Sequence, residues 1–199
     1  MKANGVSISN ARIKHDLNLL KNISINLPSN EFRILVDSGY AVEAVMGGYI
    51  TRSHDDLDLI IVTNLTSIAP LKKSLLKLMN TEKRTNWTAL PTKKNWLWLQ
   101  EKDTIDSQHH RLNVHILTSN GDYDGLKLNV YSSSGHPYSI ETITCNLHIP
   151  YGDKIKISSP VMEFVVASKI WLIESYGNNP RPKDIYDLKK KEYHMISFF

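Results

Sequence analysis

The pattern of apolar and polar positions predicts a chain that mixes helices with short strands. Apolar residues recur at helical spacing over residues 8–26 and 66–80, with lysines between them, so both segments are predicted to be amphipathic helices. Apolar runs at Phe32–Val36 and Leu59–Val62 predict buried strands, separated by a short helix at Tyr40–Met46. The first half of the chain is therefore expected to run helix, strand, turn, helix, strand, helix.

The second half is expected to contain more strands and two closing helices. Strand-like alternation recurs over residues 96–99, 111–117 and 126–131, and twice within 138–157. A polar loop is expected from Glu101 to His110. Ser158, Ser159 and Pro160 are typical of a helix start. The helix is expected to have a broad apolar stripe made of Val161, Phe164, Val165, Trp171 and Leu172. A last helix is predicted to open over residues 181–189.

Length and composition narrow the class of protein. A chain of 199 residues is expected to form one domain over 1–199, with a core at about 27–131 and C-terminal strands and helices at 138–199. The net charge of +4 suits a protein that handles nucleotides but is too scattered to indicate DNA or RNA. A single cysteine, Cys145, excludes an internal disulfide. Apolar runs are too short to cross a bilayer and no signal peptide is visible, so a cytoplasmic protein without a membrane partner is expected.

Asp56 and Asp58 are the first candidates for chemistry. They stand two apart at the start of a predicted strand, so both are expected to project from one face while Leu57 points into the packing. Two adjacent carboxylates repel each other, and a hard divalent cation relieves that repulsion. Mg²⁺ is commonly held by one or two carboxylates together with substrate phosphates. A solvated acidic strand edge is the alternative for the pair taken alone.

A second phosphate signal lies upstream, in the turn formed by Ser38 and Gly39. A small-residue turn that opens a helix presents backbone N–H groups and the positive end of the helix dipole, and both suit a phosphate. The hydroxyl of Ser38 could add a donor. By itself such a turn is an ordinary helix start. Followed closely by paired aspartates, it becomes half of a nucleotide–metal site.

The order of these residues resembles the polymerase-β-type nucleotidyltransferases, and within them the lincosamide and aminoglycoside 2''-adenylyltransferase group. The match runs through Gly39-Tyr40-Ala41, Gly47 and the string Thr51-Arg52-Ser53-His54-Asp55-Asp56-Leu57-Asp58. Ser38 stands where that group has the first glycine of a pair. The resemblance implies an α+β fold, with a mixed nucleotidyltransferase-type sheet flanked by helices and the C-terminal helices packed on the core.

The resemblance also implies an activity, the transfer of a nucleoside monophosphate, most simply AMP from ATP, to a hydroxyl group. The acceptor would be a small molecule such as an aminoglycoside or a lincosamide, which is an antibiotic-resistance activity. A tRNA or protein acceptor, as in toxin-type relatives, stays open. Mg²⁺ would be bound by Asp56 and Asp58, and the turn at Ser38 and Gly39 would seat the terminal phosphates of ATP.

Two basic residues acquire possible roles from the same resemblance. Arg52 would either clamp a phosphate or form an Arg–Asp brace within its loop. Lys183 belongs to a K-D-x-x-D-L string similar to the closing helix of many such enzymes, where the lysine can approach the triphosphate. Asp184, which follows it, is explained by the helix dipole.

One position departs from the pattern of the group. The group carries a third carboxylate in a D-x-H arrangement on a later strand, where this chain has Asn113 followed by His115. An amide cannot accept a proton or neutralise a cation as a carboxylate does. Either the protein is a weakened or inactive relative that binds a nucleotide or a partner, or another group acts as the base. His115 is one option, and Glu101, Asp103 and Asp106 in the preceding segment are others.

Overall fold

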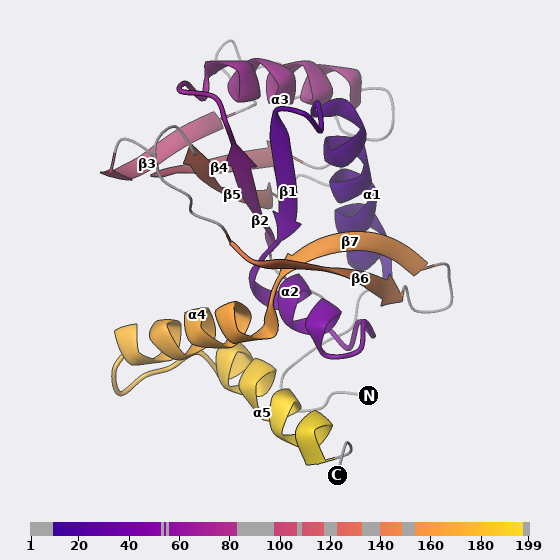
Figure 1. The fold of residues 1–199 in the computed structure, drawn as a ribbon, viewed down its shortest axis with the longest axis vertical. Coiled ribbons are helices and arrows are strands. Elements are labelled where there is room, and N and C mark those ends of the chain that lie inside the picture. The colour runs from indigo at the N-terminus through magenta and orange to yellow at the C-terminus, as the bar shows by residue number, and fades with distance from the viewer. Residues whose placement is uncertain are drawn as a thin grey trace. The chain divides into compact units, whose positions relative to one another are not determined.

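A five-stranded mixed sheet and a smaller two-stranded sheet organise this α+β protein (Figure 1). The computed structural model describes residues 10–52, 54, 56–82, 98–106, 109–117, 123–132, 140–148 and 154–196. The chain divides into two compact units, one made of residues 15–34 and 55–139, the other of residues 1–14, 35–54 and 140–199. The single domain expected from the length of the chain stays a prediction.

The large sheet has the strand order β1-β2-β5-β4-β3. Its strands are β1 (Phe32–Val36), β2 (Asp56–Thr63), β3 (Trp98–Asp106), β4 (His109–Leu117) and β5 (Tyr123–Ser132). β2 and β5 are parallel, whereas β5 with β4 and β4 with β3 are antiparallel. The mixed sheet expected from the sequence is therefore confirmed.

The polar loop expected from Glu101 to His110 is wrong, because most of that segment is strand. β3 continues to Asp106, and β4 begins at His109. β3 is the outermost strand beyond β4, and an edge strand tolerates polar and charged side chains because part of it stays in water. The segment therefore forms a strand because it pairs with β4, although most of its side chains are polar.

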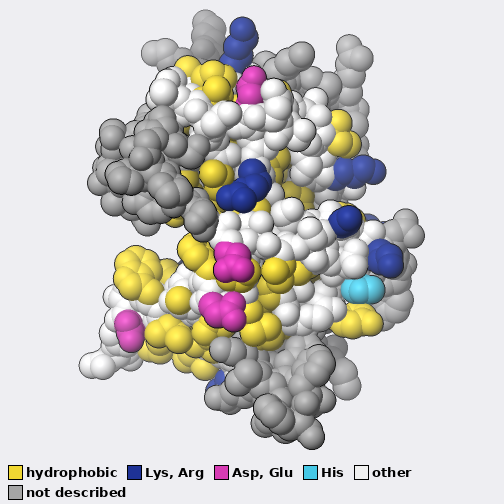
Figure 2. All heavy atoms as spheres, in the orientation of Figure 1, with side chains coloured by type: hydrophobic (Ala, Val, Ile, Leu, Met, Phe, Trp, Pro, Cys, Tyr) yellow, Lys and Arg dark blue, Asp and Glu magenta, His cyan; other side chains and the backbone are white. Residues whose placement is uncertain are grey.

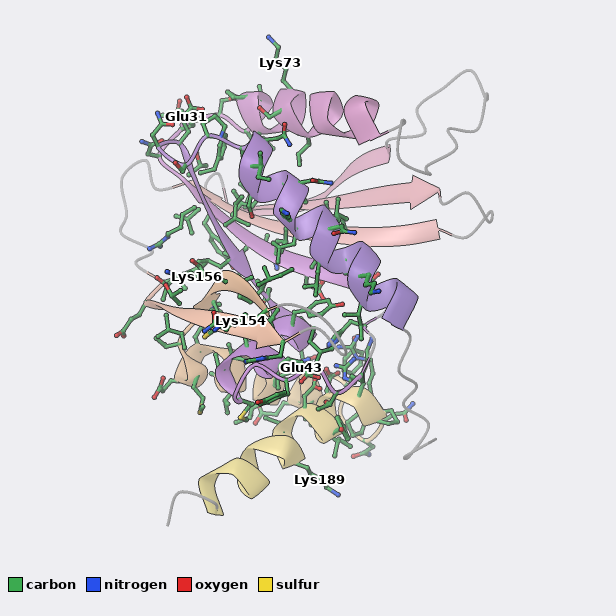
Figure 3. All side chains as sticks on the ribbon, turned by 90° about the vertical axis from the view of Figure 1, so that its right-hand side faces the viewer. Glu31, Glu43, Lys73, Lys154, Lys156 and Lys189 are labelled. Atoms are coloured by element: carbon green, nitrogen blue, oxygen red, sulfur yellow. The ribbon has the colours of Figure 1, made fainter. Side chains whose placement is uncertain are left out.

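The two faces of the large sheet differ in character. Leu57, Leu59 and Ile61 of β2 are fully buried and lie opposite Leu126, Leu128 and Val130 of β5, which are buried as well. The alternate positions carry Asp56, Asp58 and the buried Ile60 on β2, and Lys127 and Asn129 on β5. Two helices, α1 (Asn10–Asn26) and α3 (Ala69–Glu82), supply the buried residues Leu17, Leu20, Leu71 and Leu75. Figure 3 shows α1 lying across the sheet. The face that carries Asp56, Asp58 and Lys127 is termed the polar face, although Ile60 is buried on it.

The other unit combines three helices with a β-ribbon. Its elements are α2 (Ser38–Val45), β6 (Thr142–His148), β7 (Lys154–Pro160), α4 (Met162–Ser175) and α5 (Pro182–Ile196). α2 contacts α4 and both strands of the ribbon, and α4 contacts α5 (Figure 1). The two strands expected within residues 138–157 are confirmed as β6 and β7, and the final helix is confirmed as α5.

One expectation about α4 is wrong and another holds in part. Ser158 and Ser159 do not start the helix, because they pair with β6 as part of β7 and the helix begins at Met162. Within the expected stripe Val165 is buried, at 2% exposure, whereas Phe164 and Trp171 are 37% and 62% exposed. Figure 2 shows hydrophobic side chains at the surface over this helix.

A glycine turn joins α2 to the ribbon. Gly48 has a φ of +79°, and a Cβ there would lie 1.9 Å from the carbonyl oxygen of Asn146. The close approach lets the His148 N–H donate to the Gly48 carbonyl, and Tyr49 then stacks on the His148 ring with centroids 4.6 Å apart.

Among the described residues, no helix combines the length and apolarity that a membrane span requires.

Candidate active site

The acidic pair at the start of β2 has the geometry that the sequence predicts. Asp56 and Asp58 are both partly exposed, whereas Leu57 between them is fully buried. Since side chains alternate along a strand, this burial pattern places both carboxylates on the polar face of the sheet. The expectation that they project together is confirmed.

A lysine from the neighbouring strand meets this pair. Lys127 of β5 lies opposite Asp58 in the ladder, and its Nζ donates a hydrogen bond to Oδ2 of Asp56. The side chain of Lys127 is 48% exposed and that of Asp56 25% exposed, so water reaches both partners. The charge that faces the carboxylates from the next strand is therefore a cation of the chain itself.

The strand register also locates the backbone of Asn113 and His115 relative to the two aspartates. Asp58, Lys127 and Asn113 form one row across β2, β5 and β4, and Asp56, Gly125 and His115 form the row two residues away. With strands about 4.8 Å apart, Asn113 and His115 lie about 10 Å from the aspartates across the sheet. Lys127, rather than Asn113, occupies the position directly beside Asp58.

The other candidate bases lie farther away. Glu101, Asp103 and Asp106 all belong to β3, which is separated from β2 by β5 and β4. Three strand spacings amount to about 14 Å. The register therefore favours His115 over these three carboxylates as a base for a reaction at β2.

The fit of a magnesium ion follows from the donor set. Within the part of the chain that the structure describes, no group of three or more His, Cys, Asp or Glu side chains gathers into a metal site. Asp56 and Asp58 nevertheless offer hard oxygen ligands on one accessible face. Such a pair suits Mg²⁺, which keeps several waters and takes phosphate oxygens as further ligands. The residues therefore fit a site that substrate completes, with Lys127 already bonded to one ligand.

In the other unit, Ser38 opens α2 with a strained backbone. Its φ is +54°, an uncommon value for a residue with a side chain. The N-cap residue Asp37 accepts a hydrogen bond from the Ser38 N–H at 2.7 Å. One donor of the expected phosphate turn is thus engaged by a carboxylate. The Ser38 hydroxyl oxygen accepts a longer bond, 3.4 Å, from Nζ of Lys169.

The segment after α2 is fixed to that helix through Glu43. Thr51 donates to Oε1 of Glu43 from both its N–H and its hydroxyl, at 3.2 and 2.9 Å, and Nε2 of His54 lies 3.9 Å from the same oxygen. The His54 ring packs against Tyr40 and directly over Gly39, where a Cβ would lie 2.0 Å from Nδ1. Gly39 is thus needed for the packing of His54, independently of any phosphate.

Arg52 forms a buried brace with the C-terminal helix. Its Nε and Nη2 donate to Oδ1 of Asp187 at 3.2 and 3.0 Å, and Nη2 also donates to Oδ2 at 2.9 Å. Arg52 is 4% exposed and Asp187 3% exposed. Of the two roles open for Arg52, these contacts favour the brace, and its partner comes from α5 rather than from the same loop.

Lys169 of α4 completes this buried cluster, and the sequence analysis missed it. Its Nζ lies 2.9 Å from Asp184 Oδ1 and 2.9 Å from Asp187 Oδ2, and it is 2% exposed. Figure 1 shows α4 and α5 packed together, as this bridge requires. A signal was available, because Lys169 is the single charged residue within the apolar segment 164–173.

Asp184 does more than complement a helix dipole. Burial raises the pKa of its carboxyl, but hydrogen bonds from Lys169 and Arg181 and their positive charges lower it by more, so the pKa lies below the ordinary 3.8. Arg181 donates to Oδ2 of Asp184 at 2.7 Å and covers the Tyr176 ring at 4.9 Å from its centroid. Lys183 lies half-buried in the first turn of α5.

Comparisons of the sequence with family models and with curated proteins add no relative. No protein-family model matches this chain, and no curated protein matches it at a significant level. The residues of the chain and their contacts are therefore the basis on which a function is assigned.

Proposed function

We propose that this protein is a magnesium-dependent nucleotidyltransferase that moves a nucleoside monophosphate onto a hydroxyl group. The nucleotide is most simply ATP, with AMP as the transferred group. The acceptor class is a small hydroxylated molecule, of which aminoglycosides and lincosamides are the examples that the sequence resemblance suggests. The fold proposed with it is the nucleotidyltransferase-type arrangement of a mixed sheet and helices.

The observation that carries the proposal is the placement of Asp56 and Asp58. Both project from the polar face of β2, at the very start of the strand, where they are partly exposed. Before this strand lie His54, whose ring packs on Tyr40 and over Gly39, and Arg52, which is braced by Asp187. Arg52 and His54 are therefore assigned a structural role within their own unit.

The chemistry follows from these ligands. Asp56 and Asp58 would hold Mg²⁺, which when bound neutralises the negative charge that builds up on the transferred phosphoryl group. The acceptor hydroxyl oxygen forms a bond to the α-phosphorus while the bond from that phosphorus to the bridging oxygen breaks, and pyrophosphate leaves with the electron pair. The hydroxyl proton goes to a base, and the register favours His115 for this role.

The unit that contains α2 is proposed to bind the triphosphate. The Ser38 hydroxyl and the N-terminal N–H groups of α2 are its donors, with Gly39 beside them. Nζ of Lys169 donates a hydrogen bond to the hydroxyl oxygen of Ser38. Lys183 is proposed to approach the phosphates from the first turn of α5.

A second candidate function is nucleotide or partner binding without turnover. Two observations favour it. Asn113 replaces the carboxylate that the resembled group carries, and Lys127 holds Asp56 in an ion pair. Both changes reduce the negative charge available to a metal ion on this face.

Release of pyrophosphate from ATP and Mg²⁺ tests the enzymatic proposal, with aminoglycosides, lincosamides and tRNA as acceptors. Wild-type protein should release pyrophosphate with a small hydroxylated acceptor, and Asp58→Asn should reduce the rate by about 100-fold or more. The matched control is Glu174→Gln, an exposed carboxylate on α4, which should leave the rate unchanged.

Three outcomes would contradict the enzymatic proposal or redirect it. Equal rates for wild type and Asp58→Asn would show that the acidic pair is not catalytic. Release with tRNA alone would move the acceptor class to nucleic acid. If no acceptor supports release by the wild type but Asn113→Asp gains it, the second candidate function holds.

A further inference from the structure

The polar face of the large sheet carries a charge arrangement that the proposed transfer reaction does not explain. Two carboxylates, Asp56 and Asp58, face Lys127 on the adjacent strand β5. The next position in the same row is the neutral Asn113. The row therefore contains an acidic, a basic and an amide side chain, whereas a metal site on a sheet would bring several acidic side chains together. Lys127 supplies part of the positive charge that a metal ion would otherwise provide.

The exposure of this ion pair decides how firmly it holds. Lys127 is 48% exposed and Asp56 is 25% exposed, so the pair is screened by water and is a weak interaction. A weak pair can be displaced by a divalent ion, but the ion must still overcome the repulsion of the nearby ammonium group. A triphosphate changes that balance, because its oxygens offer the lysine another anionic partner.

We propose that Lys127 is a built-in counter-ion that competes with a divalent cation for Asp56 and transfers to the polyphosphate when a nucleoside triphosphate binds. The metal site then has low affinity in the free protein, and metal and nucleotide bind cooperatively. This inference rests on the proposed function, since it assigns Asp56 and Asp58 to the metal.

Binding of Mn²⁺, followed by electron paramagnetic resonance as a stand-in for Mg²⁺, tests this without any turnover. Lys127→Met removes the charge and keeps the length of the side chain. By Coulomb's law, a unit charge about 6 Å from a divalent ion in water changes its affinity about tenfold. Lys127→Met should therefore bind Mn²⁺ about tenfold more tightly than wild type in the absence of nucleotide.

The matched control is Lys73→Met, in the same unit. Lys73 is exposed on α3 and points away from the protein (Figure 3), so its removal should leave Mn²⁺ affinity unchanged. A non-hydrolysable ATP analogue should strengthen Mn²⁺ binding to wild type more than to Lys127→Met, because only the wild type has a lysine to transfer.

The remaining variant, Asp56→Asn, separates failure of this inference from failure of the proposed function. If Asp56→Asn weakens Mn²⁺ binding while Lys127→Met equals wild type, the acidic pair binds metal and the counter-ion role is wrong. If Asp56→Asn binds Mn²⁺ as well as wild type, or if none of the proteins binds it, the acidic pair is not a metal site and both proposals are overturned.

Discussion

Two pairs of aspartates in this protein contact basic side chains, yet the pairs differ in their burial and in the burial of those partners. Asp184 and Asp187 of α5 are almost entirely buried and are bonded to Lys169, Arg52 and Arg181. Asp56 and Asp58 of β2 are partly exposed, and the basic group that meets them, Lys127, is half in water. The first pair has partners from three separate segments, and the second pair meets a half-exposed lysine of a neighbouring strand.

The difference indicates which of the two pairs has a structural role. Separating a buried charge from its partner has a large desolvation cost. Asp184 and Asp187 therefore keep Arg52 and Lys169 in place. Exposed charges exchange partners at little cost, because water replaces what is lost. The same residue type therefore braces the protein in one unit and lies partly in water in the other.

Asp187→Asn should have the largest effect on stability. The substitution removes the charge that compensates both Arg52 and Lys169 in a buried setting, and the loss of one partner of a buried pair typically costs about 3–5 kcal/mol. Urea denaturation followed by circular dichroism measures this loss. A free energy of unfolding within about 0.5 kcal/mol of wild type would show that the brace does not hold the fold.

Acidification should weaken the same cluster reversibly. The folded protein lowers the pKa of Asp184 below 3.8, so the ionised carboxylate stabilises the fold at pH values above 3.8. That contribution is lost as the pH falls through the lowered folded-state pKa. The urea midpoint of wild type should fall in this acidic range, and Asp184→Asn should lack this part of the dependence. An unchanged acid slope in the variant would contradict the assignment.

Asp58→Asn should have the smallest effect on stability, although the chemical change is the same as in Asp187→Asn. A partly exposed carboxylate outside the buried network contributes little to folding, and the free energy of unfolding should stay within about 0.5 kcal/mol of wild type. The same urea titration gives a direct comparison of the two variants. A loss of about 2 kcal/mol or more would place Asp58 in the structural class with Asp187.

Local patterns in the sequence were enough to predict the elements around the acidic pair. The apolar run that ends at Val62 and the alternation at Asp56, Leu57 and Asp58 depend on neighbours a few residues away, so periodicity reveals the strand and its polar face. The strand at Phe32–Val36 and the short helix that follows it were found for the same reason, although the helix begins earlier, at Ser38.

The partners of the charged residues were decided by the tertiary structure. Arg52 and Asp187 are 135 residues apart, and Lys169 reaches Ser38 over a separation of 131. Lys127 meets Asp56 across 71 residues, through the parallel pairing of β2 with β5. Each ion pair depends on two segments that only folding brings together, and no local pattern states which of several cations will reach a given carboxylate. The sequence therefore determined where the acids stand on their strand and helix, and the packing determined which of them are neutralised in the interior and which face the solvent.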